Sequence, residues 1–254
     1  MLVERLDAVG RLPENQDPTK QFAISIARRA LLDAKVTDPG PESTVDRLPF
    51  STKPEVVLLN FREKFTAKER KAIEAKGGLV YTSTGLTILA QGESQARKGK
   101  PSFRYITEGG DQLLRAPSMK TQIAIFPVPS ESFVPGSFGK DLPIQERMAA
   151  EDAKRLGLPN VTQIIPNEAS TLTGIVFQHL EATDEWLFGQ EYANAQDLDY
   201  VYARTKNPTN SSGSNVAGVG SARPVHGVYV DDFPRDHGRR NLGAFRLVVP
   251  IKTK

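Results

Sequence analysis

The spacing of hydrophobic positions predicts helices in three parts of the chain. In residues 21–35 the apolar side chains recur at helical spacing with charged residues on the other faces, which is typical of an amphipathic helix. Residues 143–156 repeat this pattern between a proline in the first turn and Gly157 at the end. Residues 169–189 predict a further helix, although the β-branched run within them leaves a strand as the alternative.

A second group of segments has the pattern of strands around a short helix. Residues 54–61 form a continuous apolar run of strand length, and Thr66 with Glu69 predicts a capped helix that ends near Gly77. Residues 79–91 are rich in β-branched and aromatic types. We expect them to form one or two strands that complete a small β-α-β unit.

The remaining segments divide into strands and irregular connections. Residues 103–107, 121–128 and 243–251 have the composition of strands, the last of them closing the chain. Residues 37–54 and 207–221 are dominated by Pro, Gly, Ser, Asn and Thr. The former predict a linker and the latter a surface loop.

Together these elements predict an α+β fold. We expect a small N-terminal helical and β-α-β region followed by a mixed, loop-rich C-terminal domain. The N-terminal helix and linker fall in residues 1–50, the strand-rich module in 51–140 and the loop-rich domain in 141–254.

Composition narrows the classes of function. Of the 254 residues, 33 are basic and 30 acidic, and the resulting net charge of +3 is spread along the chain. A nucleic-acid binder usually concentrates its basic residues, so we expect no nucleic-acid partner. The absence of cysteine excludes disulfides, thiolate nucleophiles and Cys-ligated metals, and it fits a cytoplasmic location. No apolar run is long enough to span a membrane, so no membrane partner is expected.

The densest polar cluster follows an apolar stretch near the end of the chain and contains Asp231, Asp232, Asp236 and His237. A hard cation such as Ca²⁺ suits such carboxylates, but their spacing is not that of an EF-hand. Arg235 and the arginines after it neutralise these acids without a metal. A salt-bridged structural loop is therefore the simpler interpretation, with a Ca²⁺ site or a metal-dependent enzyme as the alternative.

Motifs of the common enzymes are missing from the sequence. It contains no GxSxG elbow, no P-loop and no GxGxxG after a strand. The three histidines, His179, His226 and His237, are too far apart in sequence to form a helical metal pair. The sequence therefore favours binding over catalysis.

The last fifth of the chain carries a recognisable order of segments: a small-residue loop, then ARPVHGVYV, then the polar DDFPRDHGRR and finally NLGAFRLVVP. It resembles the ending of C-type-lectin-like domains of the formylglycine-generating and diversity-generating variable-protein type. Ala244 stands as an extra residue between the Gly and the Phe of their closing motif. The resemblance implies a domain whose terminal strands hold ligand-binding loops. Oxidase activity does not carry over, because that chemistry needs cysteines.

In such domains the ligand surface corresponds to the region just before the closing strand, and the cluster described above marks the same region. Tyrosine, aspartate and arginine on a β scaffold combine rigid aromatic contact with directional polar contact. We therefore expect a non-catalytic binding protein for a protein or glycan ligand, without a cofactor. The alternatives are a homo-oligomer or a structural subunit of a large complex such as a virion. The expected ligand-binding residues are Tyr229, Asp231, Asp232, Phe233, Arg235 and His237.

Overall fold

A computed structural model describes residues 61–108, 111–223 and 226–252. The helix expected in residues 21–35, the linker in 37–54 and the strand in 54–61 lie outside this part, apart from Phe61. The described elements are, in order, α3 (Ala67–Glu74), β1 (Leu79–Thr82), α4 (Ile88–Arg97), β2 (Phe103–Ile106), α5 (Asp111–Leu114), β3 (Gln122–Ile125), α6 (Leu142–Leu156), β4 (Val161–Gln163), α7 (Ala169–Thr183), α8 (Gln190–Asn194), β5 (Tyr202–Pro208), β6 (Asn215–Arg223), β7 (Gly227–Pro234), β8 (Leu242–Gly243) and β9 (Leu247–Pro250).

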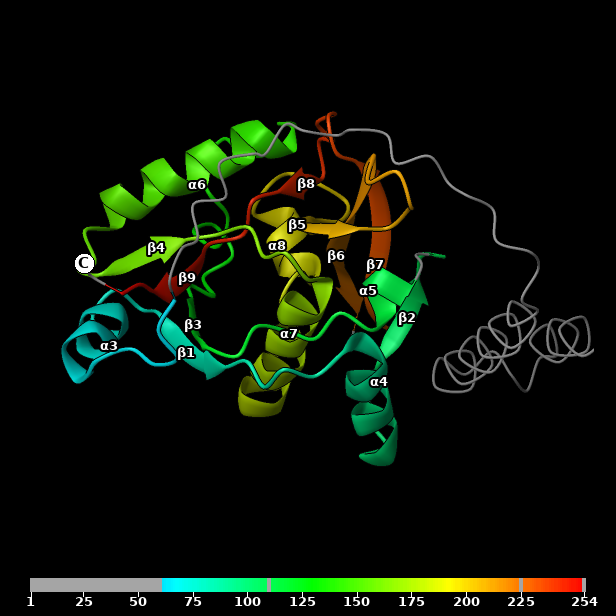
Figure 1. The fold of residues 1–254 in the computed structure, drawn as a ribbon, viewed down its shortest axis with the longest axis horizontal. Helices are drawn as coiled ribbons and strands as arrows, with labels where there is room; N and C mark the ends of the chain where they lie inside the picture. The colour runs from blue at the N-terminus through cyan, green and yellow to red at the C-terminus, as the bar shows by residue number, and fades with distance from the viewer. Residues whose placement is uncertain (1–60, 109–110, 224–225, 253–254) are drawn as a thin grey trace, which may run out of the picture. The chain divides into compact units, whose positions relative to one another are not determined.

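The strands form two sheets, and the fold is of the α+β class (Figure 1). The four-stranded sheet has the order β1-β3-β9-β4 with antiparallel neighbours. The five-stranded sheet has the order β2-β7-β6-β5-β8, in which β2 runs parallel to β7 and β8 parallel to β5. Both sheets combine strands from before and after residue 140, so the sequence-based division at that residue does not coincide with a division of the sheets.

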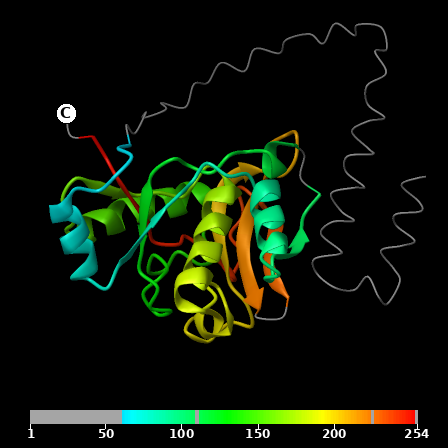
Figure 2. The same ribbon diagram turned by 90° about the horizontal axis from the view of Figure 1, so that it is seen from below.

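Helix α7 is the buried centre of this fold. Ten of its 15 residues are buried, including polar ones such as Ser170 and Thr173, which is typical of a helix enclosed by other elements. It lies against one face of the five-stranded sheet (Figure 2), where Phe177 contacts Phe103 of β2 edge-to-face at a ring distance of 5.2 Å. On its other side, His179 meets Tyr81 of β1. Of the helix expected over residues 169–189, Ala169–Thr183 is confirmed and the remainder is wrong, because the left-handed Asp184 ends the helix. The alternative of a strand is wrong.

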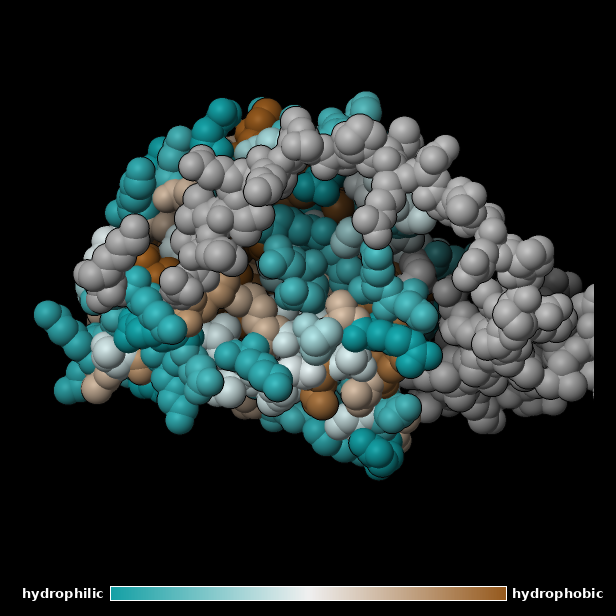
Figure 3. Space-filling view, in the orientation of Figure 1, coloured by the Kyte–Doolittle hydropathy of each residue, from teal (hydrophilic) through white to brown (hydrophobic). Residues whose placement is uncertain are grey.

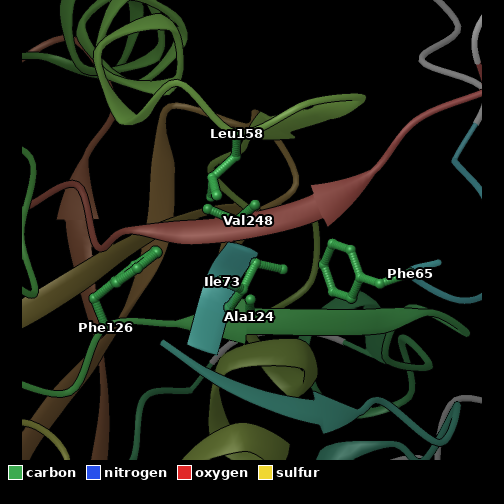
Figure 4. Packing of buried hydrophobic residues seen from close by; sticks show 6 residues of the cluster. All are labelled: Phe65, Ile73, Ala124, Phe126, Leu158 and Val248. Atoms are coloured by element: carbon green, nitrogen blue, oxygen red, sulfur yellow. The ribbon is translucent and has the colours of Figure 1, made fainter. Parts of the chain in front are cut away.

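The core of the four-stranded sheet is a cluster of apolar side chains that converge from α3, β3, β9 and the segments flanking them (Figure 4). Ile73 of α3 and Val248 of β9 are fully enclosed in it. The members are Phe65, Ile73, Ala124, Phe126, Leu158 and Val248.

Two helices have the end signals that the sequence predicts, Thr66 with Glu69 at the start of α3 and Gly157 at the end of α6. Thr66 and Glu69 form a reciprocal capping box at the start of α3, as expected from their spacing. Asp141 caps α6 by accepting a hydrogen bond from the backbone N–H of Ile144, and Gly157 ends that helix in a left-handed conformation with φ of 61°. Both predictions are confirmed.

The expectation of strands across residues 79–91 is correct for β1 and wrong for the second half. Thr87 accepts a hydrogen bond from the backbone N–H of Ala90 and starts α4 at Ile88. The buried face of α4 carries Gln91 and Gln95 where an amphipathic helix usually has apolar residues. Hydrophobic periodicity therefore does not reveal this helix.

The surface loop expected in residues 207–221 is also largely wrong, since only residues 209–214 connect strands. From Asn215 the chain forms β6, a central and mostly buried strand. Its small residues have a packing reason: a Cβ at Gly218 would lie 2.6 Å from the Phe233 ring, and one at Gly220 would lie 2.1 Å from the Val201 carbonyl oxygen. The small residues that predicted a loop therefore belong to a strand, where neighbouring rings and backbone leave no room for larger side chains.

The closing segment, expected as one strand, divides between the two sheets as β8 and β9. Arg246, between them, donates to both carboxylate oxygens of Asp152 on α6, at 2.8 and 3.1 Å. Gln163 of β4 donates to the same carboxylate at 2.8 Å. Burial alone would raise the pKa of Asp152, but the hydrogen bonds and charge of Arg246 lower it. The arginine of the closing motif is therefore a structural residue.

Candidate ligand-binding site

Strand β7 presents three of the six predicted ligand-binding residues on one face of the five-stranded sheet. Side chains alternate along a strand, so Tyr229, Asp231 and Phe233 share a face and Asp232 lies on the opposite one. The face that carries Val228 and Val230 is buried against α7, because Val228 pairs with Phe103, which contacts that helix. We call the opposite face, with Tyr229, the outer face.

A row of aromatic rings crosses the outer face from the edge strand β2 to β5. Tyr105 of β2 lies 6.4 Å from Tyr229, measured between ring centroids, with the planes inclined by 38°. Tyr202 of β5 lies 5.1 Å from Phe233 and 5.9 Å from Tyr200. Tyr105 and Tyr200 are each 45% exposed, whereas Tyr202 and Phe233 are buried beneath the others. The row therefore has a packed centre and two exposed ends.

Asp231 lies within this row and is half-buried. Burial raises the pKa of its carboxyl group; the Asp232 charge adds to this, while a hydrogen bond from the backbone N–H of Asp232 opposes it. The Asp231 carboxylate in turn contributes to the raised pKa of Tyr202, after burial as the main cause. Within the described residues Asp231 forms no ion pair. It is a carboxylate among tyrosine rings, and none of the described residues is its cationic partner.

The polar loop that follows β7 is held differently from the salt-bridged loop predicted from the sequence. No ion pair of the described chain joins its acids to its arginines. Instead Arg204 of β5, only 1% exposed, donates to the backbone carbonyl oxygens of Pro234 at 3.1 Å, His237 at 3.0 Å and Lys140 at 3.3 Å. Burial lowers the pKa of this guanidinium to about 10. The loop is therefore anchored through its backbone.

The other predicted site residues do not join the outer-face row. Asp232 is exposed and accepts hydrogen bonds from Asn215 at 2.6 Å and Thr107 at 3.5 Å. Arg235 and His237 are exposed in the loop that Arg204 anchors. Among the residues that the structure describes, no group of three or more histidine and acidic side chains is placed to hold a metal ion. The predicted cluster is thus divided by the alternation of β7 and by the loop after it.

Three residues of the row, Tyr105, Tyr200 and Tyr202, are not among the residues selected from the sequence. The alternation of Tyr200 and Tyr202 was a local signal, since residues two apart share one face of a strand. Tyr105 meets Tyr229 only because β2 pairs with β7 across more than a hundred residues of chain. That pairing has no local signal.

In the described part of the chain, a hollow between α4 and α7, beside Gln95 and Phe177, measures about 110 Å³, below the several hundred Å³ typical of small-molecule pockets. Figure 3 shows one face of the molecule, on which hydrophilic residues predominate and hydrophobic ones form separate patches. The outer face is therefore the candidate site because of its row of rings.

Comparisons of the chain with known protein families, with curated proteins and with solved structures find no match. None of the helices in the described ranges has the length and apolar character needed to cross a membrane.

Proposed function

We propose that this chain is a non-catalytic binding protein that recognises a protein ligand through the outer face of its five-stranded sheet. The observation that carries the proposal is the row of aromatic rings on this face, whose two ends, Tyr105 and Tyr200, are each 45% exposed. Tyr229 packs against the buried cluster of Tyr202, Phe233 and Leu242 and so joins the two parts of the row. Tyrosine gives a large contact area at a small cost in side-chain entropy, and it is enriched at protein interfaces.

The packing beneath the row supports a binding role. Phe233 and Tyr202 are buried and fix the rings above them, and Gly218 leaves the space that the Phe233 ring occupies. A preformed aromatic surface loses little freedom when a ligand binds, which favours affinity. The loop after β7 borders this surface, so Arg235 and His237 extend it with exposed polar groups.

The resemblance of the closing segment to C-type-lectin-like domains supports the same surface. It places the ligand surface just before the closing strands, which is where β7 contributes Tyr229 and Asp231 to the outer face. In that interpretation β8 and β9 are the terminal strands that hold the binding region. A glycan ligand is the alternative that this resemblance adds, and the experiment below distinguishes it.

The experiment uses the six tyrosines of the chain as reporters. The protein is labelled with 3-fluorotyrosine, and fluorine NMR spectra are recorded while peptide pools or oligosaccharides are added. We expect peptide to shift the resonances of Tyr105, Tyr200 and Tyr229 and to leave those of Tyr81 and Tyr192 unchanged. Tyrosine-to-phenylalanine variants assign each signal.

The control for this experiment is a dilution series without ligand. If the same resonances move with protein concentration alone, the outer face binds a second copy of the chain, and the assembly alternative replaces the proposal. If no class of ligand and no concentration moves them, the outer face is not a binding surface.

A further inference from the structure

We infer that the group bound at the outer face is a cation, a lysine or arginine side chain of the protein ligand, held by the Asp231 carboxylate between the rings of Tyr229 and Tyr202. This inference rests on the proposed function, because it names the chemistry that the same surface recognises.

The charge of Asp231 favours a cation. Asp231 is half-buried, and its carboxylate has no ion-pair partner among the described residues. Within the described ranges its carboxylate accepts one hydrogen bond, from the backbone N–H of Asp232 at 2.9 Å. A partly desolvated carboxylate that none of these residues neutralises is stabilised by a cation from a ligand, since the cation restores the lost solvation.

The aromatic rings beside Asp231 also favour a cation. The face of an aromatic ring attracts a cation within about 6 Å of its centre. Tyr229 and Asp231 are two residues apart on one strand face, and Tyr202 lies close enough to Asp231 for that carboxylate to help raise its pKa. A lysine or arginine side chain at this place would form a charge-assisted hydrogen bond with the carboxylate and cation–π interactions with the tyrosine rings.

Anionic ligands are disfavoured at the same place. A phosphate or carboxylate group at the same place would meet the charge of Asp231 and the electron-rich ring faces, both of which repel anions. Arg223 lines a small hollow at the Tyr200 end of the row together with Asp199 and Ser221. The cation therefore binds at the Asp231 part of the row rather than at the Tyr200 end.

The test titrates the full chain, labelled with 3-fluorotyrosine, with four probes: terminally blocked hexalysine, hexaarginine, hexaglutamate and a neutral chitooligosaccharide. We expect the two basic peptides to shift Tyr229 and Tyr202, and hexaglutamate to leave them unchanged. Asp231→Asn should weaken hexaarginine binding about tenfold, which corresponds to ~1.4 kcal/mol.

Asp232→Asn is the matched control, because it removes the same charge one residue away on the opposite face of β7. We expect it to change the dissociation constant by less than about twofold, since an exposed charge contributes little. Unchanged thermal unfolding of both variants shows that each is folded. Equal weakening by the two substitutions would mean non-specific attraction to the acidic residues and would overturn the inference.

The other outcomes separate this inference from the proposed function. If the oligosaccharide shifts the outer-face tyrosines and the basic peptides do not, the binding face stands, its ligand is a glycan, and the cationic inference is wrong. If hexaglutamate binds as tightly as hexaarginine, the inference is equally wrong. If no probe and no peptide pool moves these signals, both the inference and the proposed function fail.

Discussion

The hydroxyl group of Tyr81 lies 2.7 Å from Nδ1 of His179 and joins the four-stranded sheet to the buried helix α7. His179 is only 1% exposed, and none of the described residues forms a hydrogen bond with its Nε2. Burial lowers the pKa of His179 below its usual value of 6.5, and the charge of Glu185 partly opposes this. The histidine is therefore neutral in the folded protein near neutral pH.

This relationship predicts a loss of stability in mild acid. A histidine with a lower pKa in the folded than in the unfolded state binds more protons when unfolded. The free energy of unfolding therefore falls as the pH drops from above 6.5 towards the lower folded pKa. Urea unfolding near about pH 7.5 and about pH 5.5 measures this loss, and we expect it to be smaller in His179→Gln.

Tyr81→Phe is the control, because it removes the hydrogen bond and keeps the buried histidine. It should cost about 1 kcal/mol at neutral pH and retain the acid sensitivity. An identical pH dependence in the wild type and His179→Gln would show that other groups cause the loss.

The ion pair between Asp152 and Arg246 predicts a large and non-additive effect. Asp152 is buried, so Arg246→Ala leaves its carboxylate with Gln163 as the remaining side-chain donor and should destabilise the fold by about 3–5 kcal/mol. The double variant Asp152→Ala/Arg246→Ala should cost less than the sum of the single variants. Chemical denaturation of the wild type, the two single variants and the double variant gives the interaction free energy between the two side chains. Additive losses would show that the ion pair does not contribute to stability.

Gly220→Ala tests the glycine positions under the aromatic row. Its Cβ would lie 2.1 Å from the Val201 carbonyl oxygen and 2.6 Å from Cα of Tyr202, both backbone atoms that cannot move aside cheaply. We expect a loss above about 2 kcal/mol. Gly99→Ala, with open space but a φ of 63°, should cost only about 1 kcal/mol. Equal losses in the two variants would argue against close packing at β6.

Arg204→Leu should release the loop after β7 from the sheet. The loop contains the exposed residues Arg235, Arg239 and Arg240, at which trypsin can cleave once the backbone is mobile. We expect cleavage there to become several-fold faster, and stability to fall by about 3 kcal/mol because three hydrogen bonds to a charged group are lost. Cleavage after Lys98 or Lys100 reports any general loosening. Acceleration at all sites alike would mean that Arg204 stabilises the whole fold and not this loop.

The sequence predicted those elements whose signals are local. The helices α3 and α6 were found because Thr66 and Gly157 mark their ends, and the α+β class followed from the mixture of patterns. Helix α4 and strand β6 were missed because each violates a local rule for a tertiary reason. Glutamines fill the buried face of α4, and Gly218 and Gly220 make room for rings of other strands.

The candidate site shows the same division. Tyr229, Asp231 and Phe233 could be selected from one segment, and the alternation of β7 then decides that Asp232 lies on the other face. Tyr105 joins them only through the parallel pairing of β2 with β7, which depends on the whole fold. The sequence therefore predicts single residues of the candidate site but not which aromatic rings of other strands lie beside them.

Strand β9 is paired on both sides, to β3 and to β4, although both of those strands precede it by more than eighty residues of chain. During synthesis from the N-terminus, β3 and β4 leave the ribosome without the strand that joins them. The four-stranded sheet can close only after residues 247–250 have emerged. Until then Ala124 has its β1 partner Val80 but not Val248, and Val161 lacks Pro250. The interval before β9 emerges is therefore the one in which the incomplete sheet is most open to chaperones and to aggregation.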